Sequence, residues 1–117
     1  NVYDLKWVGD LTYRDVYHRA EYEFSKYAFE VADIGVLRAS FENYEEEASR
    51  CIDQNLVLPA YDYVLKCSHV FNILDARGAF GTAQRAEYMG RVRSLARLVA
   101  RSWVDRAHEE AAGNGDR

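Results

Sequence analysis

The stretch that decides the fold is LKCSHVFNILDARGAFGTAQR, residues 65–85, in which one glycine separates two helical patterns. We expect the first helix to begin at Pro59, because the missing N–H of proline would have no intrahelical partner in a first turn. Gly78 stands where a residue in the left-handed conformation ends a helix without a Cβ penalty. The sequence therefore predicts a helix over 59–77.

Three further helices are predicted around this one. The hydroxyl of Thr12 can accept a first-turn N–H, and the acid Asp15 is favoured near the positive end of a helix. Asp33 is suited to cap the next helix in the same way, and Thr82 to open the last. The expected helices cover 13–30, the residues from Asp33 to about Asn55, 59–77 and 82–108.

Apolar residues recur in each of these segments at intervals of three or four, as in amphipathic helices. The residues expected in the core are Val16, Ala20, Phe24 and Tyr27; Leu37, Phe41, Tyr44, Ala48 and Ile52; Tyr61, Val64, Leu65, Ser68, Phe71 and Leu74 or Asp75; and Tyr88 or Met89, Val92, Leu95 or Ala96, Val99 and Trp103. Short connections favour antiparallel neighbours. The predicted fold is all-α, a small antiparallel bundle of about four helices, with an extended segment over 1–11, a helical domain over 12–110 and a flexible tail over 111–117.

Composition sets the outer limits of this fold. A chain of 117 residues with 49% hydrophobic and 29% charged residues is long enough for one domain with one core, and it is too apolar to be disordered. It contains no apolar run of the length of a membrane span, so no membrane partner is expected. Cys51 and Cys67 lie in amphipathic patterns away from any metal-ligand spacing, which predicts two buried free thiols. Because the chain begins at Asn1 without an initiator methionine, we expect a piece of a longer protein.

The net charge of −4 disfavours nucleic-acid binding through bulk charge alone, but the charges are unevenly distributed. The acids lie mostly before Tyr63 and include the run Glu45–Glu47. The last predicted helix is rich in arginine: Arg85, Arg91, Arg93, Arg97, Arg101 and Arg106. The two parts of the sequence are therefore electrostatically complementary.

The residue types at His69, Asp75 and Arg77 are those of acid–base or phosphate chemistry, but their spacing disfavours a shared site. At about 100° per residue, His69 and Asp75 lie about 120° apart around a helix, and Asp75 and Arg77 lie on nearly opposite sides. We therefore interpret them as structural. His69 and Asn72 are expected to bond buried groups, Asp75 to neutralise an arginine of the last helix, and Arg77 to contact a helix C-terminal end.

Other pairs have the spacing of metal ligands on a helix, namely His18 with Glu21, and Glu42 with Glu45 and Glu46. No second ligand motif would complete a coordination sphere, so we predict no metal site. The sequence also contains no phosphate-binding glycine loop or nucleophile motif. We therefore assign no catalytic and no cofactor-binding residue to it.

Arg93, Arg97 and Arg101 follow one another at intervals of four and would form a stripe on the last helix. Guanidinium groups can bind phosphates through two hydrogen bonds, so this stripe is the candidate for a contact with an RNA backbone. Pairing with the acidic helices or with another subunit is the favoured interpretation, because an acidic chain otherwise repels a polyanion.

Several motifs together resemble one protein family. They are Tyr3-Asp4-Leu5, the run from Tyr13 to His18, and above all the block with Ser68, His69 and Phe71 through Arg77. This sequence resembles, from Val2 to about Trp103, the C-terminal part of the α chain of bacterial-type glycyl-tRNA synthetase, in its two-subunit or its fused, plastid-like form.

The resemblance implies a class II aminoacyl-tRNA synthetase that uses ATP and Mg²⁺ to attach glycine to tRNA-Gly. Its catalytic core would lie upstream of this segment, which alone would be an inactive helical domain. The implied partners are that core, a second α chain, a β chain or fused β region, and tRNA-Gly. The implied location is the bacterial cytoplasm, or a plastid or mitochondrion. The alternative is a stand-alone helical partner-binding module derived from the synthetase.

Overall fold

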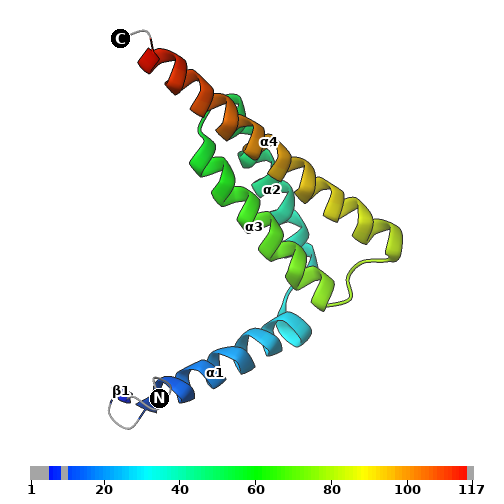
Figure 1. Ribbon diagram of the computed structural model, residues 1–117. Helices are drawn as coiled ribbons and strands as arrows, with labels where there is room; N and C mark the ends of the chain where they lie inside the picture. The colour runs from blue at the N-terminus through cyan, green and yellow to red at the C-terminus, as the bar shows by residue number, and fades with distance from the viewer. Residues whose placement is uncertain (1–5, 9–10, 116–117) are drawn as a thin grey trace. The chain divides into compact units, whose positions relative to one another are not determined.

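A computed structural model describes residues 6–8 and 11–115 and divides the chain into two compact units, 1–32 and 33–117. The elements are β1 (Lys6–Val8), β2 (Leu11–Thr12), α1 (Tyr13–Lys26), the π-helix η2 (Tyr27–Val31), α2 (Ile34–Asp53), α3 (Val57–Ala76) and α4 (Thr82–Gly115), as shown in Figure 1. The predicted all-α fold is confirmed. Among the described residues, strands occur only in the predicted N-terminal segment and at Thr12, which follows it, and residues 1–5 and 9–10 lie outside the description.

The first unit holds a short antiparallel pair of strands followed by α1 and η2. Lys6 pairs with Thr12 in the β1–β2 register. Thr12 then caps α1 as predicted, because its Oγ1 accepts from the Asp15 N–H at 3.2 Å while the Thr12 N–H donates to Asp15 Oδ2 at 3.1 Å. These reciprocal bonds satisfy two donors that a helix start would otherwise leave without partners.

No residue of α1 or η2 is buried, which corrects the sequence-based core. Phe24 is 70% exposed and Tyr27 40% exposed. The physical reason is that an amphipathic helix buries its apolar stripe only where a second element covers it. Within the described part of the first unit, two short strands are the other elements present.

In the second unit, α2 begins after a side-chain N-cap and ends at a residue in the left-handed conformation. The Asp33 carboxylate accepts from the Val36 N–H at 3.0 Å and caps α2, as the sequence predicts. Asn55, at φ 59°, ends α2, because the Leu56 N–H can then reach the Cys51 carbonyl at 2.8 Å. Asparagine tolerates this conformation better than most residues. The hydrogen bond across the turn satisfies a carbonyl at the helix end.

The third helix begins two residues earlier than predicted, at Val57, so Pro59 occupies its third position. That position is still in the first turn, where an N–H has no intrahelical partner, so proline is tolerated. The C-terminus follows the prediction. Gly78 has φ 72°, and the N–H groups of Gly78 and Ala79 bond the carbonyls of Asp75 and Leu74, each at 3.0 Å.

Helix α3 packs against both α2 and α4, and the three helices run antiparallel to their chain neighbours (Figure 1). The buried residues of this unit include Leu37, Phe41, Ala48, Val57, Ala60, Val64, Cys67, Val70, Phe71, Ile73, Leu74, Tyr88, Leu95 and Val99. Four aromatic rings contact one another in this core. The ring centre of Tyr88 lies 4.8 Å from the ring centres of both Phe41 and Phe80, and the Phe80 ring stacks on that of Phe71 with 5.5 Å between centres. Tyr61, Leu65 and Trp103 were predicted to be buried and are instead exposed.

Helix α4 continues to Gly115, beyond the predicted end near His108. The boundary between the compact units, after Ala32, falls inside the predicted helical domain over 12–110, and that domain division stays a prediction. The flexibility predicted for 111–117 stays a prediction. In the described part of the chain, no helix is long and apolar enough to cross a membrane.

Two glycines allow a matched test of the Gly78 turn. Gly78→Ala is expected to lower the free energy of unfolding by about 1 kcal/mol, because a Cβ is strained at positive φ even though no atom lies within 4 Å of the added group. Gly90, in the interior of α4, also has nothing within 4 Å but has no positive φ. Gly90→Ala is therefore expected to raise the unfolding free energy by about 0.5–1 kcal/mol. Urea denaturation of both variants measures these shifts, and equal signs would contradict the assignment.

The buried thiol of Cys67 predicts a pH dependence of stability. Burial raises the pKa of Cys67 from 9.0 to about 11. In the unfolded chain the thiol ionises at the lower value. The stability that the protein gains from keeping this thiol neutral is therefore complete below about pH 9 and is lost as the pH rises to about 11. Two pKa units correspond to about 3 kcal/mol. The difference in unfolding free energy between the wild type and Cys67→Ala should therefore shrink over that range, and a constant difference would contradict the prediction.

Candidate interaction surface

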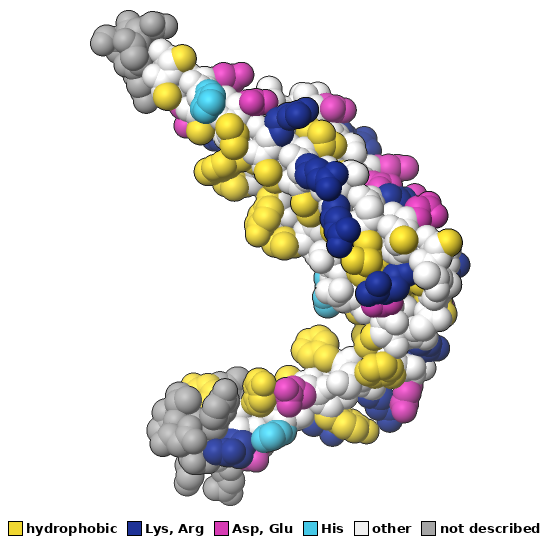
Figure 2. All heavy atoms as spheres, turned by 45° about the vertical axis from the view of Figure 1, so that its right-hand side comes forward, with side chains coloured by type: hydrophobic (Ala, Val, Ile, Leu, Met, Phe, Trp, Pro, Cys, Tyr) yellow, Lys and Arg dark blue, Asp and Glu magenta, His cyan; other side chains and the backbone are white. Residues whose placement is uncertain are grey.

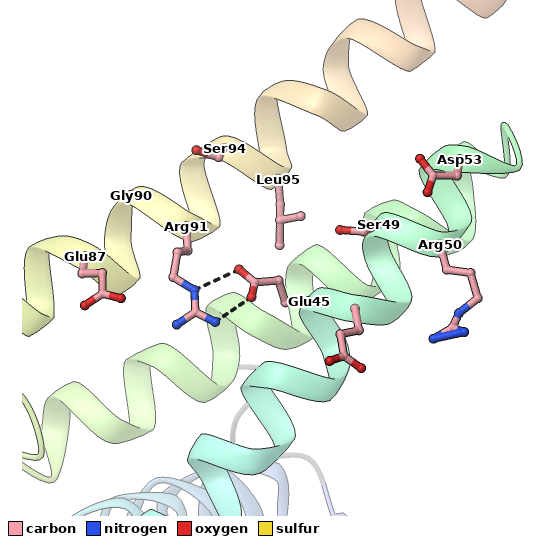
Figure 3. Close-up of a pocket in the computed structure, with 10 residues that line it drawn as sticks. Glu45, Ser49, Arg50, Asp53, Glu87, Gly90, Arg91, Ser94 and Leu95 are labelled. Carbon is pink, nitrogen blue, oxygen red and sulfur yellow. Dashed lines mark hydrogen bonds and ion pairs between the residues drawn. The ribbon is translucent and has the colours of Figure 1, made fainter.

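A cleft of about 730 Å³ lies between α2 and α4. Figure 3 shows Glu45, Ser49, Arg50 and Asp53 on α2 and Glu87, Arg91 and Leu95 on α4, with the Arg91 and Glu45 side chains pointing toward each other. The acidic residues on the α2 side include Glu45, which belongs to the acidic run Glu45–Glu47 of the sequence. In the described part of the chain, no group of three or more His, Cys, Asp or Glu side chains could hold a metal ion.

Arg91 closes one end of this cleft by bonding two glutamates of α2. Its Nε and Nη2 donate to the two carboxylate oxygens of Glu45 at 3.0 and 2.6 Å, and Nη2 also donates to Glu42 at 2.9 Å. The guanidinium carbon lies 4.9 Å from the Phe41 ring centre and 4.8 Å from that of Tyr88. The hydrogen bond with Glu45 raises the pKa of Arg91. Arg91 therefore links α4 to α2, and the two glutamates neutralise its charge.

The residues of the 69–78 segment do not form one site. Asp75 lies against α4, where the Arg85 Nε donates to its Oδ1 at 2.9 Å. His69 and Asn72 are exposed, so the expectation that they bond buried groups is wrong. Arg77 is the C-cap residue of α3, and its buried Nη1 has no hydrogen-bond partner among the described residues. The sequence placed these side chains on different faces, and the structure keeps them apart.

Arg93, Arg97 and Arg101 are all exposed on α4. Other arginines of this helix have acidic partners, since Arg85 pairs with Asp75, Arg91 with Glu42 and Glu45, and Arg106 with Glu110. The three stripe arginines make no hydrogen bond or ion pair with any described residue. We call them the arginine row. The intramolecular alternative raised by the sequence, pairing with the acidic helices, is therefore not what the described residues show.

An apolar groove of about 450 Å³ runs between the N-terminal half of α3 and the C-terminal half of α4. Its lining residues are Val57, Leu58, Tyr61 and Val64 of α3, and Ala96, Val99, Ala100, Trp103 and Val104 of α4. Figure 2 shows hydrophobic side chains gathered on this unit next to basic side chains arranged in a row. The second unit thus presents an uncovered apolar surface beside unpaired positive charges.

A family model described as the glycyl-tRNA synthetase alpha subunit matches residues 1–108 of this chain. The chain belongs to that family. The match covers the first compact unit and the second as far as residue 108, and it confirms the family indicated by the block from Ser68 to Arg77. Membership of an alpha subunit family also implies a companion β chain in the bacterial-type enzyme.

Sequence reasoning missed the groove because it assigned every regularly spaced apolar residue to one core. The sequence does indicate the groove, because α3 has a second apolar face. Leu58 and Tyr61, three residues apart on α3, are exposed and line the groove, while Ala60 and Cys67 of the same helix are fully buried and lie outside its lining. Two apolar faces on one helix indicate contacts on two sides.

Proposed function

We propose that this segment is the non-catalytic helical domain of a glycine–tRNA ligase α chain, and that it holds the α chain to a partner of the synthetase. The parent enzyme attaches glycine to tRNA-Gly with ATP and Mg²⁺, and its catalytic core lies upstream of this segment. The observation that carries the proposal is the family match over 1–108. The arginine row beside the groove supports a binding role, because exposed arginines next to aromatic and aliphatic side chains are typical of protein contacts.

The sequence itself supports placing the chemistry elsewhere. It contains none of the phosphate-binding or nucleophile motifs that an autonomous active site would need. Among the described basic side chains, Arg91 is paired, and the arginine row lies on an open helix face. An open face cannot exclude water from a reacting phosphate.

The test is glycine-dependent ATP–pyrophosphate exchange, comparing this fragment with a chain extended upstream by the proposed core. Exchange in the extended chain alone is the expected result. Exchange in neither would favour the stand-alone binding module, and exchange in the fragment would overturn the assignment of a non-catalytic domain. Circular dichroism of the fragment provides the control, because a helical spectrum excludes misfolding as the cause of inactivity.

A further inference from the structure

We propose that the α3–α4 groove and the arginine row together bind an acidic amphipathic helix of the companion β chain. This inference rests on the proposed function, since it names the partner surface of the domain. The occupant would place apolar side chains in the groove and carboxylates, spaced four residues apart, against Arg93, Arg97 and Arg101. Docking of an amphipathic helix into an apolar groove is a recurrent mode of protein recognition.

The groove has the dimensions and exposure of a helix-binding site. It extends over residues 57–64 of α3 and 96–104 of α4, which at 1.5 Å per residue is about 12 Å, or roughly two helical turns. The large side chains on its rim are half exposed or more, with Leu58 at 61%, Trp103 at 52% and Tyr61 at 51%. Covering them would remove apolar surface from water at about 25 cal/mol per Å². This region therefore offers a large gain to a partner of complementary shape.

The arginine row is in register with the α4 wall of the groove. Arg93, Arg97 and Arg101 each lie three residues before a groove-lining residue, respectively Ala96, Ala100 and Val104. Residues three apart on a helix are surface neighbours, so the row borders the groove along its length. Successive arginines are about 6 Å apart along the axis, the same spacing as acids at i and i+4 on a partner helix. Bidentate arginine–carboxylate pairs would fix the orientation of that helix.

Charge excludes a second copy of this surface as the occupant. In a two-fold dimer, each groove would face the same groove of the other copy. Every residue that lines the groove is apolar, so it offers no carboxylate to the arginines. The nearby Asp62 already binds Lys66 at 2.8 Å. Such a dimer would bring two unpaired arginine rows together without counter-charge, which is unfavourable.

RNA fits the row but not the groove. A phosphate backbone could pair with the arginines, yet it carries no apolar surface that would displace water from Leu58, Val99 and Val104. An acidic amphipathic helix matches both features at once.

The experiment uses the complete α chain and its purified β chain, with affinity measured by isothermal titration calorimetry. The groove variant is Leu58→Glu with Val104→Glu, and the row variant is Arg93→Glu, Arg97→Glu and Arg101→Glu. Both sets lie on exposed positions, so the fold should persist. Each variant is expected to weaken β-chain binding by at least about tenfold, because apolar anchors and arginines dominate such interfaces.

Two matched controls separate local from general effects. Leu98→Glu places a carboxylate on an exposed leucine of α4 outside the groove lining. Arg19→Glu with Lys26→Glu and Arg50→Glu gives the same change of net charge at exposed positions that belong neither to the row nor to the groove lining. Both controls should bind within about twofold of the wild type. Unchanged binding by the groove and row variants would overturn the inference.

A photo-crosslinking residue at position 104 identifies the occupant directly. Crosslinks to a helical β-chain peptide with acids four residues apart support the proposal. Crosslinks to the α chain's own core, to a second α chain or to tRNA overturn it. Glycine-dependent exchange by the unmodified enzyme, measured in parallel, separates the two proposals: activity without these crosslinks means that the docking inference alone fails.

Discussion

Leu74→Ala is expected to lower the free energy of unfolding of the second unit by about 4 kcal/mol, the largest change we predict for a single side chain. Leu74 is completely buried near the C-terminal end of α3. Truncation removes transfer free energy and leaves a cavity that the surrounding helices can only partly fill. Chemical denaturation followed by circular dichroism at the helical band measures the change.

The same helix supplies the control for this substitution. Leu58 has the same side chain in α3 but is 61% exposed, so Leu58→Ala should change stability by less than about 0.5 kcal/mol. If Leu74→Ala does not fold, Leu74→Met preserves most of the volume and should cost less than about 1.5 kcal/mol. Equal losses for Leu74→Ala and Leu58→Ala would mean that α3 does not pack as described.

Arg91→Ala is expected to destabilise the second unit by about 2–3 kcal/mol, the next largest effect of a single substitution. The Arg91 side chain is 22% exposed and Glu45 is 26% exposed, so removal of the arginine leaves a partly desolvated carboxylate without its two donors. Solvent access keeps the loss below that of a fully buried pair. The contacts with the Phe41 and Tyr88 rings are lost as well. Denaturant midpoints compared at low and high salt measure this change.

Arg93 is the matched control, because it lies two residues away on α4, is exposed and has no partner among the described residues. Arg93→Ala should leave stability within about 0.5 kcal/mol of the wild type. Arg91→Lys tests the geometry, because an ammonium group keeps the charge but cannot reproduce the fork toward Glu45. We expect it to recover only part of the loss. Full recovery by lysine would indicate that charge, and not the two-bond geometry, holds α2 and α4 together.

The sequence predicted where helices begin and end more reliably than which faces they bury. Thr12, Asp33 and Gly78 act through hydrogen bonds or backbone angles within a few residues of their own positions, and the structure has each where it was expected. Phe24 and Trp103 follow helical spacing equally well, yet both are exposed. Spacing reports that a helix has an apolar face, but a neighbouring element decides whether that face is covered.

The arginines of α4 also show the difference between what the sequence predicts and what the packing of the helices decides. Their concentration in the last helix and the acidity of α2 were evident from the sequence, as was the family through the block at 68–77. Only the tertiary structure decided that Arg91 binds Glu42 and Glu45 while the arginine row finds no partner among the described residues. A salt bridge requires two charged groups within a few ångströms, and that distance depends on how α2 and α4 are rotated and shifted against each other. Local sequence determines the helices, whereas packing determines which charges and apolar side chains remain for a partner.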